Sequence, residues 1–527
     1  MKNCNFIPMI NVYLSKFAPI MADGLKSKAI EGARWGFIEN FSSLAVTFIV
    51  GIFLARILSP QEYGLIGSIT IFIYISISFI DNGLSSALIK KREPDQKDFS
   101  TVFLTNLGIS IICFVVLYFL SEPIASFFNE AELTKILRVL SIVLIINALS
   151  IVQRTLLVKS VDFKRLTLCS LSSAIISGVV GIYMALKGYG VWALVGQQIS
   201  KQFVNTIMLW IVGSWSFSFS FSFGFYPNRF KELFSYGSKI LVSGLLDTLF
   251  KYLYYPIIGK FFSNAQLGQY TRADQFSNVT SNNISQIIQR VSFPILSQIQ
   301  DDNERLRNSF RTIVMVCALL SSFLCFWLSG ISHPLIIGLI GSKWTMAANI
   351  LQIISLGGVF VPLHYLNQNI LQVKGRMREY LALEIFKKIL IILSVIAGIA
   401  LGLNALLWGF VIANTLTYIV FSYFSGKYLN YNFINQFFDI LRPMLLALLS
   451  AIVCGVTTLV FVWLSKNYLN WYNPTWTNIF SLILGSAIGS FTLYLLYKIF
   501  PGKEFKEAIE LAKFWKKKGE KEGKIEG

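Results

Sequence analysis

Apolar stretches of roughly 20 residues recur along the whole chain, the length a helix needs to cross about 30 Å of hydrocarbon. Of the 527 residues, 54% are hydrophobic and only 14% are charged, whereas a soluble protein has about 25% charged residues. Such a chain leaves no room for a soluble domain of ordinary size, about 100 residues or more. We therefore expect an all-α polytopic membrane protein.

The apolar stretches indicate about 14 transmembrane helices. The expected spans are 35–57, 63–88, 100–120, 136–157, 167–187, 190–212, 237–261, 272–297, 311–331, 346–371, 382–402, 404–425, 442–464 and 478–499. Span 272–297 is much the most polar of them, and its placement depends partly on an internal repeat described below.

Lysine and arginine are distributed unevenly between the loops that alternate along these spans. One set of loops, together with both tails, holds most of them; the single loop 89–99 contains Lys90, Lys91, Arg92 and Lys97. The other set holds only Arg56, Lys135, Arg138, Lys187, Lys260, Lys343 and Lys466. Because cytoplasmic loops carry the excess of basic residues, we expect both termini in the cytoplasm. The net charge of +19 then faces the cytoplasm, and we expect no nucleic-acid partner.

The sequence offers little for cofactor chemistry. No cysteine pair has the C-x-x-C spacing, and the two histidines are His333 and His364, so a histidine-based metal site is not expected. The chain contains no G-x-x-x-x-G-K-[ST] motif, and therefore no P-loop ATPase of its own. We expect no cofactor and no enzymatic activity.

Two short segments between apolar spans resemble each other. LARILSPQEYG is followed, 204 residues later, by IGKFFSNAQLGQY. Ser59 with Glu62, and Ser263 with Gln266, have the spacing of a capping box at a helix start. Pro60 suits the first helical position. We call these two segments the first and second hinge, and expect each to be a tight outer turn.

The same shift of 204 residues relates polar stripes on four spans, each stripe lying on one side of a helix. The stripe of span 63–88 consists of Thr70, Tyr74, Ser78, Asp81 and Ser85. Its counterpart in span 272–297 consists of Asp274, Asn278, Asn282, Ser285 and Gln289. Spans 35–57 and 237–261 carry a second matched pair of stripes, Glu39, Ser43 and Thr47, and Ser243, Asp247 and Lys251.

The repeat predicts two six-helix lobes in parallel order, followed by two further helices. Each lobe has an even number of spans, so both enter the membrane from the same side and their pseudo-two-fold axis runs along the membrane normal. The expected divisions are a cytoplasmic N-terminal segment, an N-lobe, a cytoplasmic or interfacial linker, a C-lobe, the last two spans and a basic cytoplasmic tail: 1–34, 35–212, 213–236, 237–425, 426–500 and 501–527.

A charge that faces lipid at mid-membrane costs about 2.5–3.5 kcal/mol, so four charged stripes need polar surroundings. We expect a water-filled cavity between the lobes, walled by spans 35–57, 63–88, 237–261 and 272–297. The alternative is that the stripes pack together through interhelical hydrogen bonds, which suits serine and asparagine better than charged residues. The candidate cavity residues are Glu39, Ser43, Asp81, Gln198, Lys201, Asp247, Lys251, Asp274, Asn278, Asn282, Gln289, Arg290 and Asn367.

Three other polar residues inside spans have simpler interpretations. Lys387 and Lys388 lie near the inner end of span 382–402 and are expected to snorkel toward the cytoplasm. His364 is expected to be a hydrogen-bonded wall residue of the cavity and not a proton carrier.

A cavity with cations and many amides suits an anionic cargo rich in hydroxyl groups. Cations hold a diphosphate as point charges. Without an ATPase, the driving force would come from a gradient of H⁺ or Na⁺, exchanged at Glu39, Asp81, Asp247 or Asp274.

Several segments resemble a known family: KSKAIEGARWGFIENFSSLAVTFIVGIFLARILSPQEYGLIG, FIDNGLSSALIKKR, YLYYPIIGKFFSNAQLGQYTRADQF and QRVSFPILSQIQDD. They are similar to the polysaccharide-exporting, Wzx-like flippases of the multidrug/oligosaccharidyl-lipid/polysaccharide exporter superfamily. The likeness extends from about residue 24 to 500, and L-S-P-x-x-Y-G and P-x-L-S-x-I-Q-D-D are its most specific parts.

The resemblance implies two lobes around a cationic cavity, alternating access, and a cargo of oligosaccharide repeat units on a polyprenyl diphosphate. It implies a place in the cell inner membrane, serving O-antigen, capsule or exopolysaccharide assembly. We expect a monomer that contacts membrane lipids and polysaccharide polymerase machinery. The alternatives are a drug or cation antiporter of the same superfamily and, less favoured, a membrane-embedded glycan polymerase or transferase.

Overall fold

The protein is helical throughout the part that the structure, a computed structural model, describes: residues 23–81, 83–213, 224–468, 473–500 and 502. No strand occurs among these residues. Nine helical stretches in them are long and apolar enough to cross a membrane: Pro60–Lys90, Gln96–Phe128, Glu132–Lys159, Phe163–Leu186, Asn303–Gly330, Ser342–Val373, Leu403–Leu429, Phe433–Asn467 and Thr475–Ile499. The expected all-α class with many apolar helices is confirmed.

The remaining expected spans also lie in helices, but polar or charged residues interrupt these. They are α2 (Asp23–Ile57), α9 (Val191–Val212), α10 (Pro227–Tyr252) with α11 (Tyr254–Phe261), α12 (Asn264–Gln298) and α17 (Met377–Leu401). Most of the candidate cavity residues lie on these helices. The polar and charged residues that make these helices less apolar than the other spans are therefore also the residues that make them candidates for a polar pathway.

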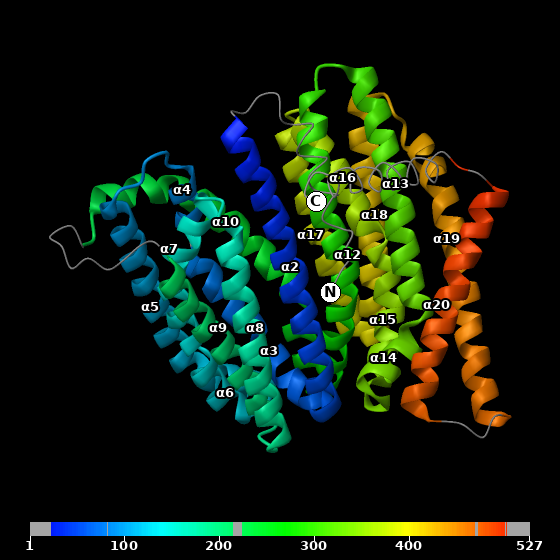
Figure 1. The fold of residues 1–527 in the computed structure, drawn as a ribbon, viewed down its shortest axis with the longest axis horizontal. Coiled ribbons are helices and arrows are strands. Elements are labelled where there is room, and N and C mark those ends of the chain that lie inside the picture. The colour runs from blue at the N-terminus through cyan, green and yellow to red at the C-terminus, as the bar shows by residue number, and fades with distance from the viewer. Residues whose placement is uncertain (1–22, 82, 214–223, 469–472, 501, 503–527) are drawn as a thin grey trace, which may run out of the picture. The chain divides into compact units, whose positions relative to one another are not determined.

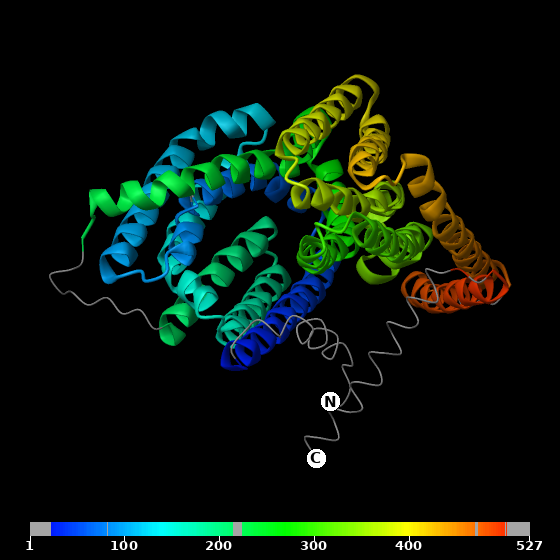
Figure 2. The same cartoon turned by 90° about the horizontal axis from the view of Figure 1, so that it is seen from above.

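Packing divides the chain into two units, the first ending at Gly268 and the second beginning at Gln269. Besides α2 and α9 to α11, the first unit contains α3 (Pro60–Asp81), α4 (Leu84–Lys90), α5 (Gln96–Phe128), α6 (Glu132–Leu140), α7 (Ile142–Lys159) and α8 (Phe163–Leu186). Its long helices contact one another in the order α2, α8, α9, α7, α5, α3, α10. The helices are labelled in Figure 1, and the view from above in Figure 2 shows α2 and α10 on opposite sides of this unit.

The first unit includes α10 and α11, which the repeat assigns to the C-lobe. The contact between α10 and α4 is close, because a Cβ on Gly83 would lie 2.3 Å from the carbonyl oxygen of Gly237. Gly83 has a φ of 71°, a conformation that glycine adopts without steric cost. The lobe boundary expected from the repeat, between 212 and 237, thus differs from the packing boundary at Gly268.

The second unit is built around a central group of helices. Besides most of α12 and all of α17, it contains α13 (Asn303–Gly330), α14 (Ser332–Ile340), the 3₁₀ turn η2 (Ser342–Trp344), α15 (Thr345–Gly358), α16 (Phe360–Val373), α18 (Leu403–Leu429), α19 (Phe433–Asn467) and α20 (Pro474–Ile499). Buried apolar residues of α13, α16, α18 and α19, among them Phe310, Leu366, Tyr418 and Ile440, form its core. The two last helices lie side by side, and α19 packs on α13 (Figure 1).

Parts of the expected terminal and linker segments fall outside the described residues. These are residues 1–22 of the N-terminal segment, 214–223 of the linker, and 501 and 503–527 of the basic tail.

A buried carboxylate holds together the ends of several helices in the first unit. Asp98 has 0% side-chain exposure, and its Oδ1 lies 2.9 Å from Lys91 Nζ and 3.8 Å from Arg229 Nε. Asp98 and Asp95 also form a reciprocal capping box at the start of α5. Burial would raise the pKa of Asp95, but hydrogen bonds from Asp98 and the charges of Arg229 and Lys91 outweigh it, and the pKa is lowered. This network ties α10 to α5 and to the segment after α4.

Replacing Asp98 by asparagine is expected to lower the free energy of unfolding by about 1.5–3 kcal/mol, the worth of hydrogen bonds to a charged group. The amide keeps part of the helix cap but loses the charge that Lys91 and Arg229 face. Thermal unfolding of the purified protein measures the loss. The exposed Glu93, in the same loop, provides the control: Glu93→Gln should leave the melting temperature unchanged, and an equal shift in both variants would contradict the role of Asp98.

Candidate functional site

Both hinges form the helix starts that their sequences predict. At the first hinge, the Ser59 amide donates to Glu62 Oε2 at 2.5 Å and the Glu62 amide donates to Ser59 Oγ at 3.4 Å. Helix α3 begins at Pro60. At the second hinge, the Gln266 amide donates to Ser263 Oγ at 3.1 Å. The reciprocal capping box at Ser59 and the single side-chain cap at Ser263 therefore fix where α3 and α12 begin.

The two hinges pack against each other through backbone, and the contact is reciprocal. A Cβ on Gly64 would lie 1.7 Å from the carbonyl oxygen of Asn264, and a Cβ on Gly268 would lie 1.7 Å from that of Pro60. The 204-residue shift that relates Gly64 to Gly268 also relates Pro60 to Asn264, so each hinge makes the same contact on the other. Only glycine permits this approach at either position.

Side chains around the second hinge attach it to α3 and to the turn after α5. Ser68 Oγ donates to Asn264 Oδ1 at 2.9 Å, and Asn264 Nδ2 donates to Glu130 Oε1 at 2.7 Å. Lys260 donates to the carbonyl oxygen of Phe127, and its Nζ lies 4.7 Å from the centre of the Phe127 ring. Lys260 thus attaches the second hinge to the last turn of α5.

Polar residues of α2 and α9 lie on half-buried or exposed helix faces. Glu39 Oε1 accepts a hydrogen bond from Ser170 of α8 at 3.0 Å. Ser43 and Lys201 are half-buried, and Gln198 is exposed. Lys201 lies one residue before Gln202, whose amide donates to Asn147 at 3.0 Å. The charged and amide side chains of α2 and α9 are therefore not fully buried in the core of the first unit.

The stripe of α3 contacts α10. Tyr74 stacks on Tyr252 with ring centres 4.6 Å apart, and Ser78 Oγ lies 3.1 Å from Thr248 Oγ1. The last member, Asp81, is exposed and accepts from Ser85. This stripe is thus partly used in packing between α3 and α10.

The stripe of α10 lies on a different face of that helix from the residues that contact α3. Ser243, Asp247 and Lys251 are exposed, whereas Thr248 and Tyr252 turn toward α3. The ammonium of Lys251 lies 5.2 Å from the centre of the Tyr252 ring. Two charged side chains one helical turn apart are therefore exposed on the first unit.

The stripe of α12 has two sides. Asp274 and Gln289 are half-buried, as is Asn278, whose amide donates to Asp274 Oδ2 at 2.7 Å. Ser285, which the sequence places in the same stripe, is instead buried and donates to the carbonyl oxygen of Ser281 at 2.8 Å. The side chains of Asn282 and Arg290 lie outside the described residues, although both belong to α12.

Buried amides of α16 serve packing within the second unit. Asn367 has 0% exposure, donates to the Leu363 carbonyl at 2.9 Å and accepts from Ser425 of α18. Asn369 donates to Ser292 of α12 at 2.9 Å. In this arrangement Asn367 lines no open space, and we leave it out of the proposed pathway.

A chain of polar side chains between α16 and α17 includes Glu384, which the sequence analysis did not single out. Gln368 Nε2 donates to Glu384 Oε1 at 2.9 Å, and Lys387 Nζ lies 3.4 Å from Nε2 of the buried His364. Lys387 is thus directed toward α16. The i, i+3 spacing of Glu384 and Lys387 inside one apolar span is the signal that would have pointed to this face.

Comparison with known proteins places the chain in a family. Residues 53–349, more than half of the chain, match the family described as Polysaccharide biosynthesis protein. The chain belongs to this family. The resemblance derived from the sequence segments is confirmed.

Curated relatives match over most of their length. The succinoglycan biosynthesis transport protein ExoT of Rhizobium meliloti is 23% identical over 487 residues, covering 91% of this chain and 94% of that protein. The teichuronic acid biosynthesis protein TuaB of Bacillus subtilis is 26% identical, covering 82% and 90%. The lipopolysaccharide biosynthesis protein WzxC of Escherichia coli K12 is 23% identical, covering 76% and 81%.

Solved structures establish the fold. The lipid II flippase MurJ in an inward closed conformation has a TM-score of 0.64 at 13% identity, covering 88% of this chain and 99% of that one. An inward-facing multidrug resistance transporter of the MATE family of the MOP superfamily has a TM-score of 0.59 at 14% identity, covering 80% of this chain and 98% of that one. Together with the apolar helices, these matches make the chain a multi-pass membrane protein with the exporter fold.

Proposed function

We propose that this protein is a flippase that moves polyprenyl-diphosphate-linked oligosaccharide repeat units from the cytoplasmic to the outer leaflet. The proposal rests on one combination of facts: the chain belongs to a polysaccharide biosynthesis family, and several helices of this apolar chain have charged residues. Lys201 and Lys251 would meet the diphosphate, and the amides of Gln198, Asn278 and Gln289 would meet sugar hydroxyls. The product would serve surface polysaccharide assembly, such as O-antigen, capsule or exopolysaccharide.

The finer architecture belongs to the same proposal. Fourteen membrane crossings, in two six-helix lobes about an axis along the membrane normal plus two helices, would place both termini in the cytoplasm. The reciprocal contact of the two hinges supports this symmetry, because a two-fold relation produces matched contacts from matched residues. The protein would act as a monomer in the inner membrane, in contact with polymerase machinery, and would transfer no chemical group.

Alternating access would be driven by an ion gradient. Glu39, Asp81, Asp247 and Asp274 are the carboxylates that would exchange H⁺ or Na⁺. Moving one charge through the membrane field is worth about 2.3 kcal/mol per 100 mV, which suffices to bias two states of similar energy. Asp247 is exposed, so exchange of its ion requires no unfolding.

Reconstitution in liposomes tests the proposal. Fluorescently labelled lipid-linked oligosaccharide, placed in both leaflets, is expected to become accessible to an external quencher or hydrolase faster with the protein than without it. An imposed H⁺ or Na⁺ gradient should change the rate or the final distribution. Absence of any acceleration over empty liposomes, in a preparation that folds and inserts, would overturn the flippase assignment.

The second candidate is a drug or cation antiporter, supported by the MATE-like fold and by the exposed carboxylate of Asp247. The cations Lys201 and Lys251, on helices of the same unit, favour an anionic cargo instead. Export of a cationic dye that disappears in Asp247→Asn would reverse this preference. Sugar transfer by purified protein without translocation would support the embedded polymerase or transferase.

A further inference from the structure

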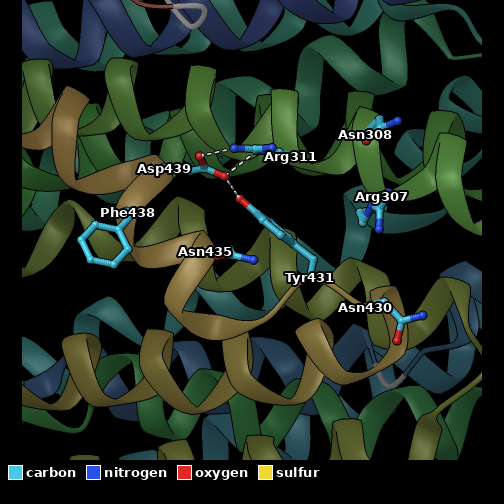
Figure 3. Close-up of a pocket in the computed structure, with 8 residues that line it drawn as sticks. All are labelled: Arg307, Asn308, Arg311, Asn430, Tyr431, Asn435, Phe438 and Asp439. Carbon is cyan, nitrogen blue, oxygen red and sulfur yellow. Dashed lines mark hydrogen bonds and ion pairs between the residues drawn. The ribbon is translucent and has the colours of Figure 1, made fainter.

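A polar cavity opens at one end of the second unit, and none of the candidate pathway residues lines it. It has a volume of about 360 Å³ and lies where α13 begins, α18 ends and α19 begins. Figure 3 shows the residues that line it: Arg307, Asn308, Arg311, Asn430, Tyr431, Asn435, Phe438 and Asp439. The loops that contribute these residues are on the side that the charge pattern assigns to the cytoplasm.

One part of the cavity is fixed by its own ion pair. Arg311 Nε and Nη2 lie 2.6 and 2.7 Å from the two carboxylate oxygens of Asp439. The hydroxyl of the buried Tyr431 also donates to Asp439. Burial and this hydrogen bond raise the pKa of Tyr431 further above neutral pH. The charge of Arg311 is therefore already balanced by Asp439.

Arg307 supplies a second positive charge, which the Arg311–Asp439 ion pair does not balance. It lies one helical turn before Arg311, an i, i+4 arrangement in which like charges repel. Among the ion pairs of the described residues none includes Arg307, and Figure 3 shows it apart from the joined group. The amides of Asn308, Asn430 and Asn435 add neutral donors around it. A cavity with one surplus cation and three amide groups suits a singly charged, oxygen-rich anion.

The surroundings of the cavity point to a lipid as the source of that anion. Phe438 lines the cavity and is 63% exposed, and it begins a line of exposed apolar residues seven positions apart along α19: Phe438, Leu445, Ile452 and Leu459. An anion with acyl chains can bind its charge in the cavity and lay its chains along this face. Basic pockets at the cytoplasmic ends of membrane helices bind anionic headgroups in this manner.

We propose that this cavity binds the phosphodiester of an anionic membrane phospholipid, with Arg307 as the charge that recognises it. The site involves none of the residues proposed to contact the cargo, so its occupancy is separable from translocation. Arg307 would hold the phosphate oxygens, the asparagine amides would hold the phosphate or glycerol oxygens, and the Arg311–Asp439–Tyr431 group would form the fixed wall.

The test uses the full-length protein in detergent, delipidated and then titrated with phosphatidylglycerol, phosphatidylcholine or soluble inorganic phosphate. Phosphatidylglycerol is expected to raise the melting temperature of the natural protein more than phosphatidylcholine does. In Arg307→Gln its apparent Kd should rise about tenfold or more, because a hydrogen-bonded charge is lost. Arg307→Lys should recover part of the affinity. The matched control is Arg305→Gln, since Arg305 is exposed on the same helix and does not line the cavity.

The outcomes separate the possible sources of the anion. Equal shifts by phosphatidylcholine, or by inorganic phosphate, would overturn the assignment to an anionic lipid. Unchanged phosphatidylglycerol affinity in Arg307→Gln would overturn the site. Should that variant fail to fold, Asn435→Ala replaces it, because Asn435 is exposed on α19; Asn430 has a φ of 49° and is less suitable. A several-fold weaker affinity in Asn435→Ala supports the site, and an unchanged one contradicts it.

Discussion

Replacing Gly64 by alanine is expected to abolish translocation and to destabilise the protein strongly. The new methyl group would lie 1.7 Å from the carbonyl oxygen of Asn264, and no side-chain rotation relieves a contact with backbone. Overpacking costs about 1–3 kcal/mol where neighbours can adjust, and we expect the upper end here. The hinges must separate to accept the methyl group, which breaks the contact from which α3 and α12 both start.

The reciprocal geometry makes Gly268→Ala a second form of the same experiment. Its effect should match that of Gly64→Ala, and the double variant should cost less than the sum, because both substitutions break one contact. Gly108→Ala in α5 is the control, since a Cβ there meets nothing within 4 Å. Thermal unfolding and the liposome assay report the two effects separately. Full stability and full turnover in Gly64→Ala would contradict the hinge geometry.

Replacing Lys251 by alanine is expected to slow flipping about 10- to 100-fold with little loss of stability. Lys251 is exposed on α10, so its removal leaves no cavity in the core. Loss of a charge contact to a phosphate is worth this factor. Initial rates in liposomes, normalised to inserted protein, give the measurement.

Two companion variants sharpen the Lys251 result. Lys251→Arg should retain most of the rate, because it keeps the charge at the same place on the helix. Lys239→Ala is the matched control, an exposed lysine of the same helix three turns earlier. Arg290→Ala is expected to act like Lys251→Ala if Arg290 contacts the cargo. Flipping at the natural rate in Lys251→Ala would remove α10 from the pathway.

Local features were predictable from sequence because they depend on near neighbours in the chain. The S-x-x-[EQ] spacing placed the helix starts at Ser59 and Ser263, and at both the serine hydroxyl accepts from the amide three residues on. The spacing of Ser243, Asp247 and Lys251 placed them on one face, and all three are exposed. Helical periodicity specifies which residues share a face, and this information is contained in a few turns.

The partner that covers each face was not predictable in the same way. Ser285 and Asn367 have the spacing of pathway residues, yet neighbouring helices bury both. Lys260 and Lys387 are long cations near span ends, and each contacts a neighbouring helix: Lys260 donates to the carbonyl oxygen of Phe127, and Lys387 lies beside His364. A single sequence shows which residues share a helix face, but not which helix packs against that face. Polar residues that pack against a neighbouring helix and polar residues that stay exposed therefore have the same sequence pattern.

The membership of α10 and α11 in the first packing unit has a consequence for biosynthesis. These helices follow the linker, so a ribosome completes α2 to α9 before the helices that cover α3 and α4 exist. Until then Tyr74 and Ser78 of α3 lack Tyr252 and Thr248, their contacts on α10. The earlier half therefore reaches its final packing only after the later half has begun to enter the membrane.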